Sequence, residues 1–203
     1  MTGPDPGLEI QPLTSANFDA LAGLFEEGGD PRWCWCAFWR LRGAAGSKAE
    51  ADQNRRLLEG LAQRGDPAPG LVALRAGRAV GWVSVGPRAG YQRLAHSKVF
   101  APLDDRPVWS IVCFVVSRPE RGRGVGTALL AAAVEHARRH GARTLEAYPA
   151  ETGGGRIPAG RANTGTVPMF TRAGFTPVIT RRAGPATRPR PILRRELTGE
   201  LSG

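Results

Sequence analysis

The stretch RGRGVG, residues 121–126, joins two segments whose hydrophobic patterns differ. Before it, residues 108–116 are mostly apolar and often β-branched, which predicts a buried strand. After it, apolar residues recur at helical spacing and predict an amphipathic helix that stops at Gly141. Glycines let the main chain approach a ligand closely, and the first N–H groups of a helix have no partner within it. Together with the helix dipole and the charges of Arg121 and Arg123, these groups predict a pyrophosphate site.

Two common phosphate-binding loops do not match this stretch. The P-loop pattern requires a Lys-Ser or Lys-Thr pair after its last glycine, and no such pair follows Gly126. The dinucleotide pattern G-x-G-x-x-G requires a third glycine at the position where Thr127 stands. On the loop alone, an ordinary strand-to-helix turn is the competing interpretation.

A different pattern, R-x-x-G-x-G, fits Arg121, Gly124 and Gly126. It resembles the acetyl-CoA signature of the GNAT N-acetyltransferase superfamily. Residues 163–175, NTGTVPMFTRAGF, resemble that family's N-x-x-A-x-x-L-Y-x-x-x-G-F segment at the expected distance downstream. The resemblance covers about residues 108–175. It implies an α/β (α+β) GNAT fold, with a mixed, mostly antiparallel twisted sheet of about seven strands, helices on both faces, and strands that splay apart at the acetyl-CoA site.

The resemblance also implies a reaction and a set of cofactor contacts. The expected reaction is direct transfer of an acetyl group from acetyl-CoA to a primary amine, without a metal. A backbone N–H near Val116 would stabilise the negative thioester oxygen of the transition state. The implied cofactor-binding residues are Phe114, Val115, Val116, Arg121, Gly122, Arg123, Gly124, Val125, Gly126, Thr127, Asn163 and Phe170.

The proton donor is where the chain departs from the family pattern. Phe170 stands where many members have a tyrosine that protonates the leaving thiolate. Tyr148 is the nearest substitute, although it could equally be a buried strand aromatic. The amine must also lose a proton, and the candidate bases are Glu146, then Glu26 and Glu27, each of which could be a solvated carboxylate instead.

The segment RWCWCAFWR, residues 32–40, holds three of the five tryptophans and reads as a helix with aromatic residues on two sides. Such a helix could be covered all round by the core or could form one wall of a pocket. Because the resemblance places the acceptor side in this region, Trp33 and Trp35 are candidate substrate-binding residues. The three cysteines (Cys34, Cys36 and Cys113) have no zinc-site spacing with the histidines, so buried or pocket-lining thiols are expected.

The chain of 203 residues suits one domain, residues 1–203, with an acetyl-CoA-binding core at about 108–182 and acceptor-side helices at about 14–64. Strands are predicted near residues 8–13, 71–75, 78–85, 108–116, 144–148, 174–182 and 192–197. Further helices are predicted near residues 47–63 and 164–173, the latter with Pro168 in its first turn. Residues 87–107 form a long loop that could line a pocket, and residues 149–161 are a glycine-rich excursion.

Charge is distributed unevenly along the chain, whose net charge is +10. Residues 1–60 contain nine acids and six bases, whereas no acid occurs between Thr152 and Arg195. A basic field attracts polyanions, which include nucleic acid and the phosphates of CoA, but no basic–aromatic nucleic-acid motif is present. Without a signal pattern or an apolar stretch long enough to span a bilayer, the sequence predicts a cytoplasmic protein with no membrane partner.

Three functions fit these observations. The first is an acetyl-CoA-dependent N-acetyltransferase, a type of acyltransferase, whose acceptor is a small-molecule or protein amine. The second is a non-catalytic acyl-CoA-binding or regulatory domain, which Phe170 would suit. A basic nucleic-acid-binding protein is the third and least supported. An exposed sheet edge could also be covered by a second copy in a homodimer.

Overall fold

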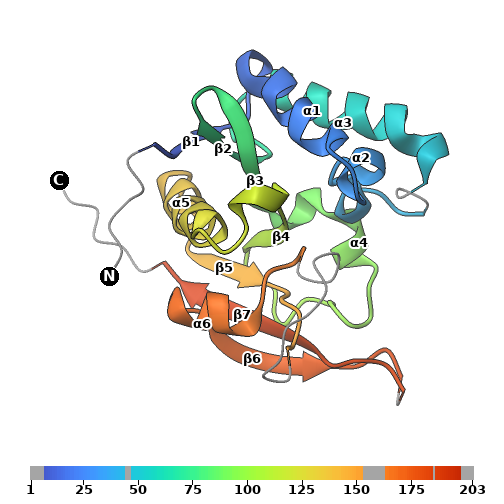
Figure 1. Cartoon of the computed structure of the whole chain (residues 1–203). Coiled ribbons are helices and arrows are strands. Elements are labelled where there is room, and N and C mark those ends of the chain that lie inside the picture. Colours follow the sequence, from blue (N-terminus) through green and yellow to red (C-terminus); the bar gives the residue numbers. More distant parts are fainter. Residues whose placement is uncertain (1–6, 44–46, 153–162, 185, 198–203) are drawn as a thin grey trace.

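A computed structural model describes residues 7–43, 47–152, 163–184 and 186–197 of the chain (Figure 1). Within these residues, seven strands form one sheet in the order β1-β2-β3-β4-β5-β7-β6. Neighbouring strands are antiparallel except for β4 and β5, which are parallel. This confirms the predicted mixed, mostly antiparallel sheet. The strands are β1 (Glu9–Pro12), β2 (Gly70–Arg75), β3 (Arg78–Pro87), β4 (Trp109–Val116), β5 (Thr144–Ala147), β6 (Thr176–Arg181) and β7 (Arg190–Glu196).

Helices cover both faces of the sheet (Figure 1). Alternation along β3 sends Trp82 to one face and Val83 and Val85 to the other. The Trp82 face packs against the helices formed by residues 18–26, 51–64 and 92–95, and the Val83 face packs against those formed by residues 125–139 and 167–172. The helices are α1 (Phe18–Glu26), α2 (Pro31–Cys34), α3 (Ala51–Arg64), α4 (Gln92–Ala95), α5 (Val125–Arg139) and α6 (Val167–Arg172). No helix of the described residues has the length and hydropathy needed to cross a membrane.

Gly81 lets α5 lie directly on β3. A Cβ atom at this position would be 2.8 Å from a methyl carbon of Val125 and 2.9 Å from one of Leu129. Real Cβ atoms do not approach other heavy atoms so closely, so a side chain here would push the first turn of α5 off the sheet. The position of α5 matters for the site because the glycine loop, residues 121–126, leads directly into this helix.

The two parallel strands separate part of the way along β4. Pairing of β4 with β5 covers only Trp109 to Ile111, although β4 continues to Val116. On the other side of β4, Ser84 pairs with Cys113 and Val85 pairs with Ile111, which leaves Val112 as an extra residue. An extra residue of this kind is a β-bulge, and bulges bend the strand that carries them. The bulge therefore lies where β4 departs from β5.

Residues 32–40 do not form the single helix that their pattern predicts. The helix α2 ends at Cys34, and both Trp35 (φ 45°) and Cys36 (φ 53°) adopt the left-handed conformation. Ala37–Trp39 then form a separate 3₁₀ turn. The left-handed pair costs about 1–2 kcal/mol per residue. It redirects the chain so that Trp35 is enclosed in the core, whereas Phe38 is exposed and Trp39 lies at the edge of the same core, beside a cavity.

The remaining elements lie close to their predicted positions. Pro168 lies in the first turn of α6, as expected. The predicted loop at 87–107 contains two short helical turns, Arg88–Gly90 and α4, so it is more ordered than its sequence pattern indicates. Most of the glycine-rich segment predicted at 149–161 falls outside the described residues.

Candidate active site

The glycine loop leaves its main chain open at the start of α5. Gly122 (φ 79°) and Gly124 (φ 85°) are left-handed, and Gly124 is the N-cap of the helix. A Cβ atom added to either residue would meet no heavy atom within 4 Å. The N–H groups of Val125, Gly126 and Thr127 belong to the first helical turn, where no carbonyl of the helix can accept them. Open space and unsatisfied donors together fit an anionic ligand.

The charges around this loop favour a phosphate group. Arg121 and Arg123 are exposed, and Arg121 Nε donates to the carbonyl of Val116 at 3.1 Å, which fixes the loop to the end of β4. Glu120 is buried instead, and its carboxylate accepts a hydrogen bond from Arg75 at 3.2 Å. The acid next to the loop is therefore neutralised, while two guanidinium groups remain at the surface.

A cavity of about 1060 Å³ lies elsewhere on the molecule, and no residue of β4 lines it. Five segments that are distant in sequence line it: residues 38–43, 93–100, 150–152, 163–164 and 188–190. The main chain connects it to β4, because the N–H of Phe114 donates to the carbonyl of Asn163 at 2.5 Å and Asn163 lines the cavity. One strand thus leads into the glycine loop and is hydrogen-bonded to a residue of the cavity wall.

Aromatic side chains form one wall of this cavity. Phe38 and Trp39 meet edge to face with ring centroids 5.2 Å apart, and Trp39 also packs edge to face on Phe100 at 5.5 Å. The guanidinium of Arg93 lies 4.0 Å from the centroid of the Phe38 ring, and its Nε donates to the Phe38 carbonyl at 2.6 Å. Arg93 therefore holds the wall in place.

Besides its arginines, the cavity has polar groups whose atoms are not all bound by other described residues. Nδ1 of His96 lies 2.8 Å from the carbonyl oxygen of Gln92. A carbonyl oxygen only accepts, so Nδ1 carries the proton and Nε2 of the neutral ring keeps its lone pair. Glu151 is the only carboxylate among the described cavity residues. The hydroxyl of Thr164 is buried and has no hydrogen-bond partner within the described part of the chain.

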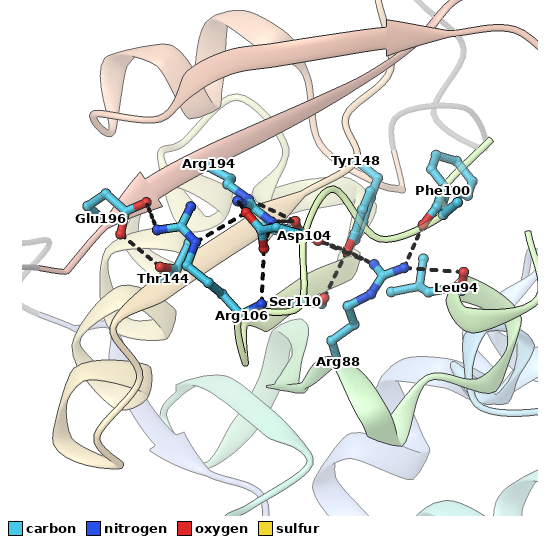
Figure 2. A network of polar contacts seen from close by, with 12 residues as sticks. Arg88, Leu94, Phe100, Asp104, Arg106, Ser110, Thr144, Tyr148, Arg194 and Glu196 are labelled. Carbon is cyan, nitrogen blue, oxygen red and sulfur yellow. Dashed lines mark hydrogen bonds and ion pairs between the residues drawn. The ribbon is translucent and has the colours of Figure 1, made fainter. Parts of the chain in front are cut away.

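Glu146 and Tyr148, which the sequence suggests as base and acid, lie outside the cavity lining in a buried polar network (Figure 2). The Tyr148 hydroxyl donates to Glu146 at 2.7 Å and accepts from Arg88 at 2.6 Å. Glu146 also accepts from Arg88 at 3.3 Å and from Arg194 Nε at 2.9 Å. Burial raises the pKa of Tyr148 above its usual value. These contacts occupy both side chains, and we assign them to structure rather than to proton transfer.

The same network anchors the segment that carries the cavity's histidine. Arg88 donates to the carbonyl of Leu94 at 3.3 Å and to that of Phe100 at 2.5 Å (Figure 2). Arg194 binds Asp104 with both terminal nitrogens, at 2.5 and 3.1 Å, and these bonds hold the pKa of Asp104 well below its usual range. Residues 88–104 are thereby tied to the ends of β5 and β7.

The other sequence candidates also lie away from the cavity. Trp35 is buried in the core against Phe18 and Phe25, with ring centroids at 6.2 and 5.4 Å. Trp33 is half-buried and stacks with Arg32, whose guanidinium carbon lies 4.0 Å from its ring centroid. The cavity-lining aromatic residues of this segment are therefore Phe38 and Trp39. The left-handed turn after Cys34, which the sequence does not signal, decides which tryptophan faces the cavity.

Two exposed acids, Glu26 and Glu27, form ion pairs at the end of α1. Glu26 pairs with Arg55 at 3.3 Å and Glu27 pairs with Arg78 at 2.5 Å. Neither acid lines the cavity. We therefore do not carry them forward as bases.

Phe170 and the thiols fill interior positions. Phe170 is fully buried and packs against Phe114 and Phe175 at centroid distances of 6.1 and 5.0 Å. Cys36 and Cys113 are buried with their sulfur atoms 3.2 Å apart. The hydrogen bond with Cys113, together with burial, raises the pKa of the Cys36 thiol well above its usual value. Neither cysteine lines the cavity, which disfavours a covalent acetyl-cysteine.

Comparison with known proteins agrees with this architecture. The family model described as acetyltransferase (GNAT) family matches residues 34–175, well over half of the chain. The chain therefore belongs to the GNAT acetyltransferase family. No curated protein sequence matches it.

Solved structures resemble the chain in fold at low sequence identity. An apo form of an agmatine N-acetyltransferase mutant superposes with a TM-score of 0.62 at 13% identity, covering 94% of this chain and 100% of the other. A Drosophila melanogaster polyamine N-acetyltransferase gives 0.61 at 14% identity, with the same coverage. A proposed acetyltransferase from Salmonella typhimurium, solved with its cofactor acetyl-CoA, gives 0.52 at 20% identity and 97% coverage of each chain.

Proposed function

We propose that the protein is an N-acetyltransferase that moves an acetyl group from acetyl-CoA directly to a primary amine bound in the cavity. The observation that carries this proposal is the position of β4, which leads into the open glycine loop and is hydrogen-bonded through Phe114 to Asn163 in the cavity wall. A cofactor held by its phosphates at the loop and extended along the free half of β4 would bring its acetyl end to that cavity. When bound, acetyl-CoA supplies the acetyl group as a thioester.

The chain's own groups suit the binding of such a cofactor. The first-turn N–H groups of α5, with Arg121 and Arg123, would hold the pyrophosphate. The main chain of Phe114 to Val116 lies beyond the pairing with β5 and would bind the extended arm. In the present structure the Phe114 N–H is taken by the Asn163 carbonyl, so binding along β4 exchanges that bond for one to the ligand.

Proton removal from the amine falls to a group inside the cavity. His96 is the base we propose, because its Nδ1–H is directed at the Gln92 carbonyl and Nε2 remains an acceptor. Glu151 is the other cavity residue that could accept a proton. Phe170 is buried and has no proton to donate, so the CoA thiolate leaves unassisted or takes its proton from solvent. A thiol has a pKa of about 8.5, so its thiolate is a stable enough leaving group without a dedicated acid.

A small amine is the acceptor class that the comparisons support best, since two of the structural neighbours act on agmatine and polyamines. The test is release of free thiol from acetyl-CoA in the presence of a panel of primary amines, with the acetylated product identified by mass spectrometry. Thiol release that requires the amine supports the proposal.

The alternative is an acyl-CoA-binding domain without catalysis, which the phenylalanine at position 170 favours. Calorimetry with acetyl-CoA distinguishes the two functions. Tight cofactor binding without thiol release for any amine would support the binding domain and would contradict catalysis.

A further inference from the structure

Three arginines converge on the cavity from two parts of the chain. Arg42 lies in the connection between α2 and α3, Arg188 lies in the connection between β6 and β7, and Arg190 begins β7. All three are exposed and line the cavity. Within the residues that the structure describes, none of their side chains forms a hydrogen bond or an ion pair. Their guanidinium groups are therefore available to a ligand.

The charge balance of the cavity is strongly positive. Arg93 also lines it, but Arg93 donates to the main chain at Phe38 and stacks on that ring. Against these four arginines, the described lining residues include a single carboxylate, Glu151. A cleft lined by charges of one sign concentrates ligands of the opposite sign and repels those of the same sign. A polycationic acceptor is therefore disfavoured here.

A second observation points to a ligand that can form a hydrogen bond inside the cavity. Thr164 is 6% exposed, its hydroxyl lacks a partner within the described residues, and it lines the same cavity. A buried hydroxyl without a partner destabilises the folded chain, and a ligand atom that bonds to it would remove that cost. Thr164 follows Asn163, whose carbonyl is bonded to β4, so this hydroxyl lies at the end of the cavity next to the free half of that strand.

Resting on the proposed function, we infer that the amine acceptor carries an anionic group, a carboxylate or a phosphate-type group, and that Arg42, Arg188 and Arg190 select it. The planar fork of an arginine matches both groups through paired N–H···O bonds. The amine end would then face His96 and Thr164, and the anionic end would face the arginines. This acceptor class is opposite in charge to the agmatine and polyamines of the two neighbouring structures.

Matched acceptors test the inference by steady-state thiol release. Butylamine, 1,4-diaminobutane, 4-aminobutyrate and 2-aminoethylphosphonate differ mainly in the charge at the end remote from the amine. We expect the two anionic compounds to exceed butylamine in kcat/KM by 10-fold or more, with the diamine slowest. Arg188→Gln and Arg42→Gln should each lower this preference several-fold through the acceptor KM and leave the acetyl-CoA KM unchanged.

Arg143→Gln is the matched control, because Arg143 is exposed, lies between α5 and β5, and is outside the cavity lining. It should leave the preference unchanged. Equal kcat/KM for butylamine and 4-aminobutyrate would overturn the inference and leave the proposed function standing. A rise in the acetyl-CoA KM of Arg188→Gln, with no change for the acceptor, would also overturn it, because the arginines would then serve the cofactor.

A binding measurement decides the inference even without turnover. Trp39 lines the cavity, so its fluorescence should respond to titration with inorganic phosphate but not with butylammonium chloride. The response should weaken several-fold in Arg42→Gln and Arg188→Gln and disappear in Trp39→Phe. Absence of thiol release with every amine contradicts the proposed function, whereas a phosphate response that persists unchanged in both arginine variants contradicts this inference.

Discussion

Two groups of arginines in this molecule differ in how fully their guanidinium groups are bound by other residues. In the buried network, Arg88 and Arg194 are bound on several sides by Glu146, Tyr148 and Asp104. At the cavity, Arg42, Arg188 and Arg190 have no such partners within the described chain. An arginine whose hydrogen bonds are satisfied internally fixes the fold, whereas one left unsatisfied at a cavity can fix a ligand. Residue type and composition do not distinguish the two groups; only their surroundings do.

Removing a network arginine is expected to have the largest effect. Arg88→Met leaves Glu146 buried without one of its cations and frees the carbonyls of Leu94 and Phe100. Breaking a buried ion pair in this way costs about 3–5 kcal/mol. Urea unfolding should show this loss in the free energy of unfolding. A loss below about 1 kcal/mol would show that the network is not a structural support.

His136 on α5 and His140, which caps that helix, repeat the contrast between unpaired and paired groups. Nε2 of His140 lies 2.5 Å from Asp66, whereas Nε2 of His136 is buried without a partner in the described residues. Burial, with the nearby His140, lowers the pKa of His136 to about 4. Between pH 6.5 and 4 the unfolded chain therefore binds a proton that the folded chain does not, so the free energy of unfolding falls as pH falls through this window.

The low pKa of His136 is expected to reduce the free energy of unfolding by about 3 kcal/mol at pH 4 and to have no effect on it above pH 7. It is measured as the difference in pH dependence between wild type and His136→Phe, because carboxylates titrate in both proteins. The variant should lose the part of the slope that begins near pH 6.5. Parallel stability curves for the two proteins would show that His136 binds its proton equally well in the folded chain.

The next largest expected effect is that of replacing the proposed catalytic base. His96→Gln removes the proposed base and should lower kcat by about 100-fold, equivalent to about 2.7 kcal/mol, without changing the free energy of unfolding. His140→Gln is the matched control outside the cavity and should keep the wild-type kcat. If His96→Gln retains full activity and Glu151→Gln does not, the base is Glu151.

Replacing a cavity arginine is expected to have the smallest effect on the free energy of unfolding. Arg188→Gln should change the free energy of unfolding by less than about 0.5 kcal/mol, as an exposed side chain without partners does. Thermal unfolding of this variant beside Arg88→Met compares the two groups directly. A large destabilisation by Arg188→Gln would place Arg188 among the structural arginines.

Much of the fold could be predicted from the sequence, because its signals are local. The glycine loop, the apolar strand before it and the periodic helix after it are adjacent in the chain, and each follows from short-range pattern. The turn at Trp35 and Cys36 could not be predicted, since neither residue is a usual left-handed residue and only tertiary packing holds them there. The positions of Phe38 and Trp39 depend on that turn.

For the candidate site, the sequence pattern predicts the cofactor loop, which stays a prediction, but it does not reveal the cavity. Glu146 has the spacing of a strand-end acid, but the arginines that occupy it, Arg88 and Arg194, are 58 and 48 positions away in sequence. The cavity is likewise assembled from five separated segments. The length of the 87–107 segment was a true signal of pocket lining, and the acid-free run from 152 to 195 was a signal of the basic side of the cavity.

The central claim is that the open main chain of the glycine loop holds acetyl-CoA, and one calorimetric comparison tests it most directly. Gly124→Val and Gly77→Val place the same side chain at glycines with φ angles of 85° and 77°, one in the loop and one in the β2–β3 turn, both facing open space. The account predicts that acetyl-CoA binds wild type and Gly77→Val with the same affinity and binds Gly124→Val at least 10-fold more weakly. Failure of wild type to bind acetyl-CoA, or equal binding by all three proteins, would contradict it.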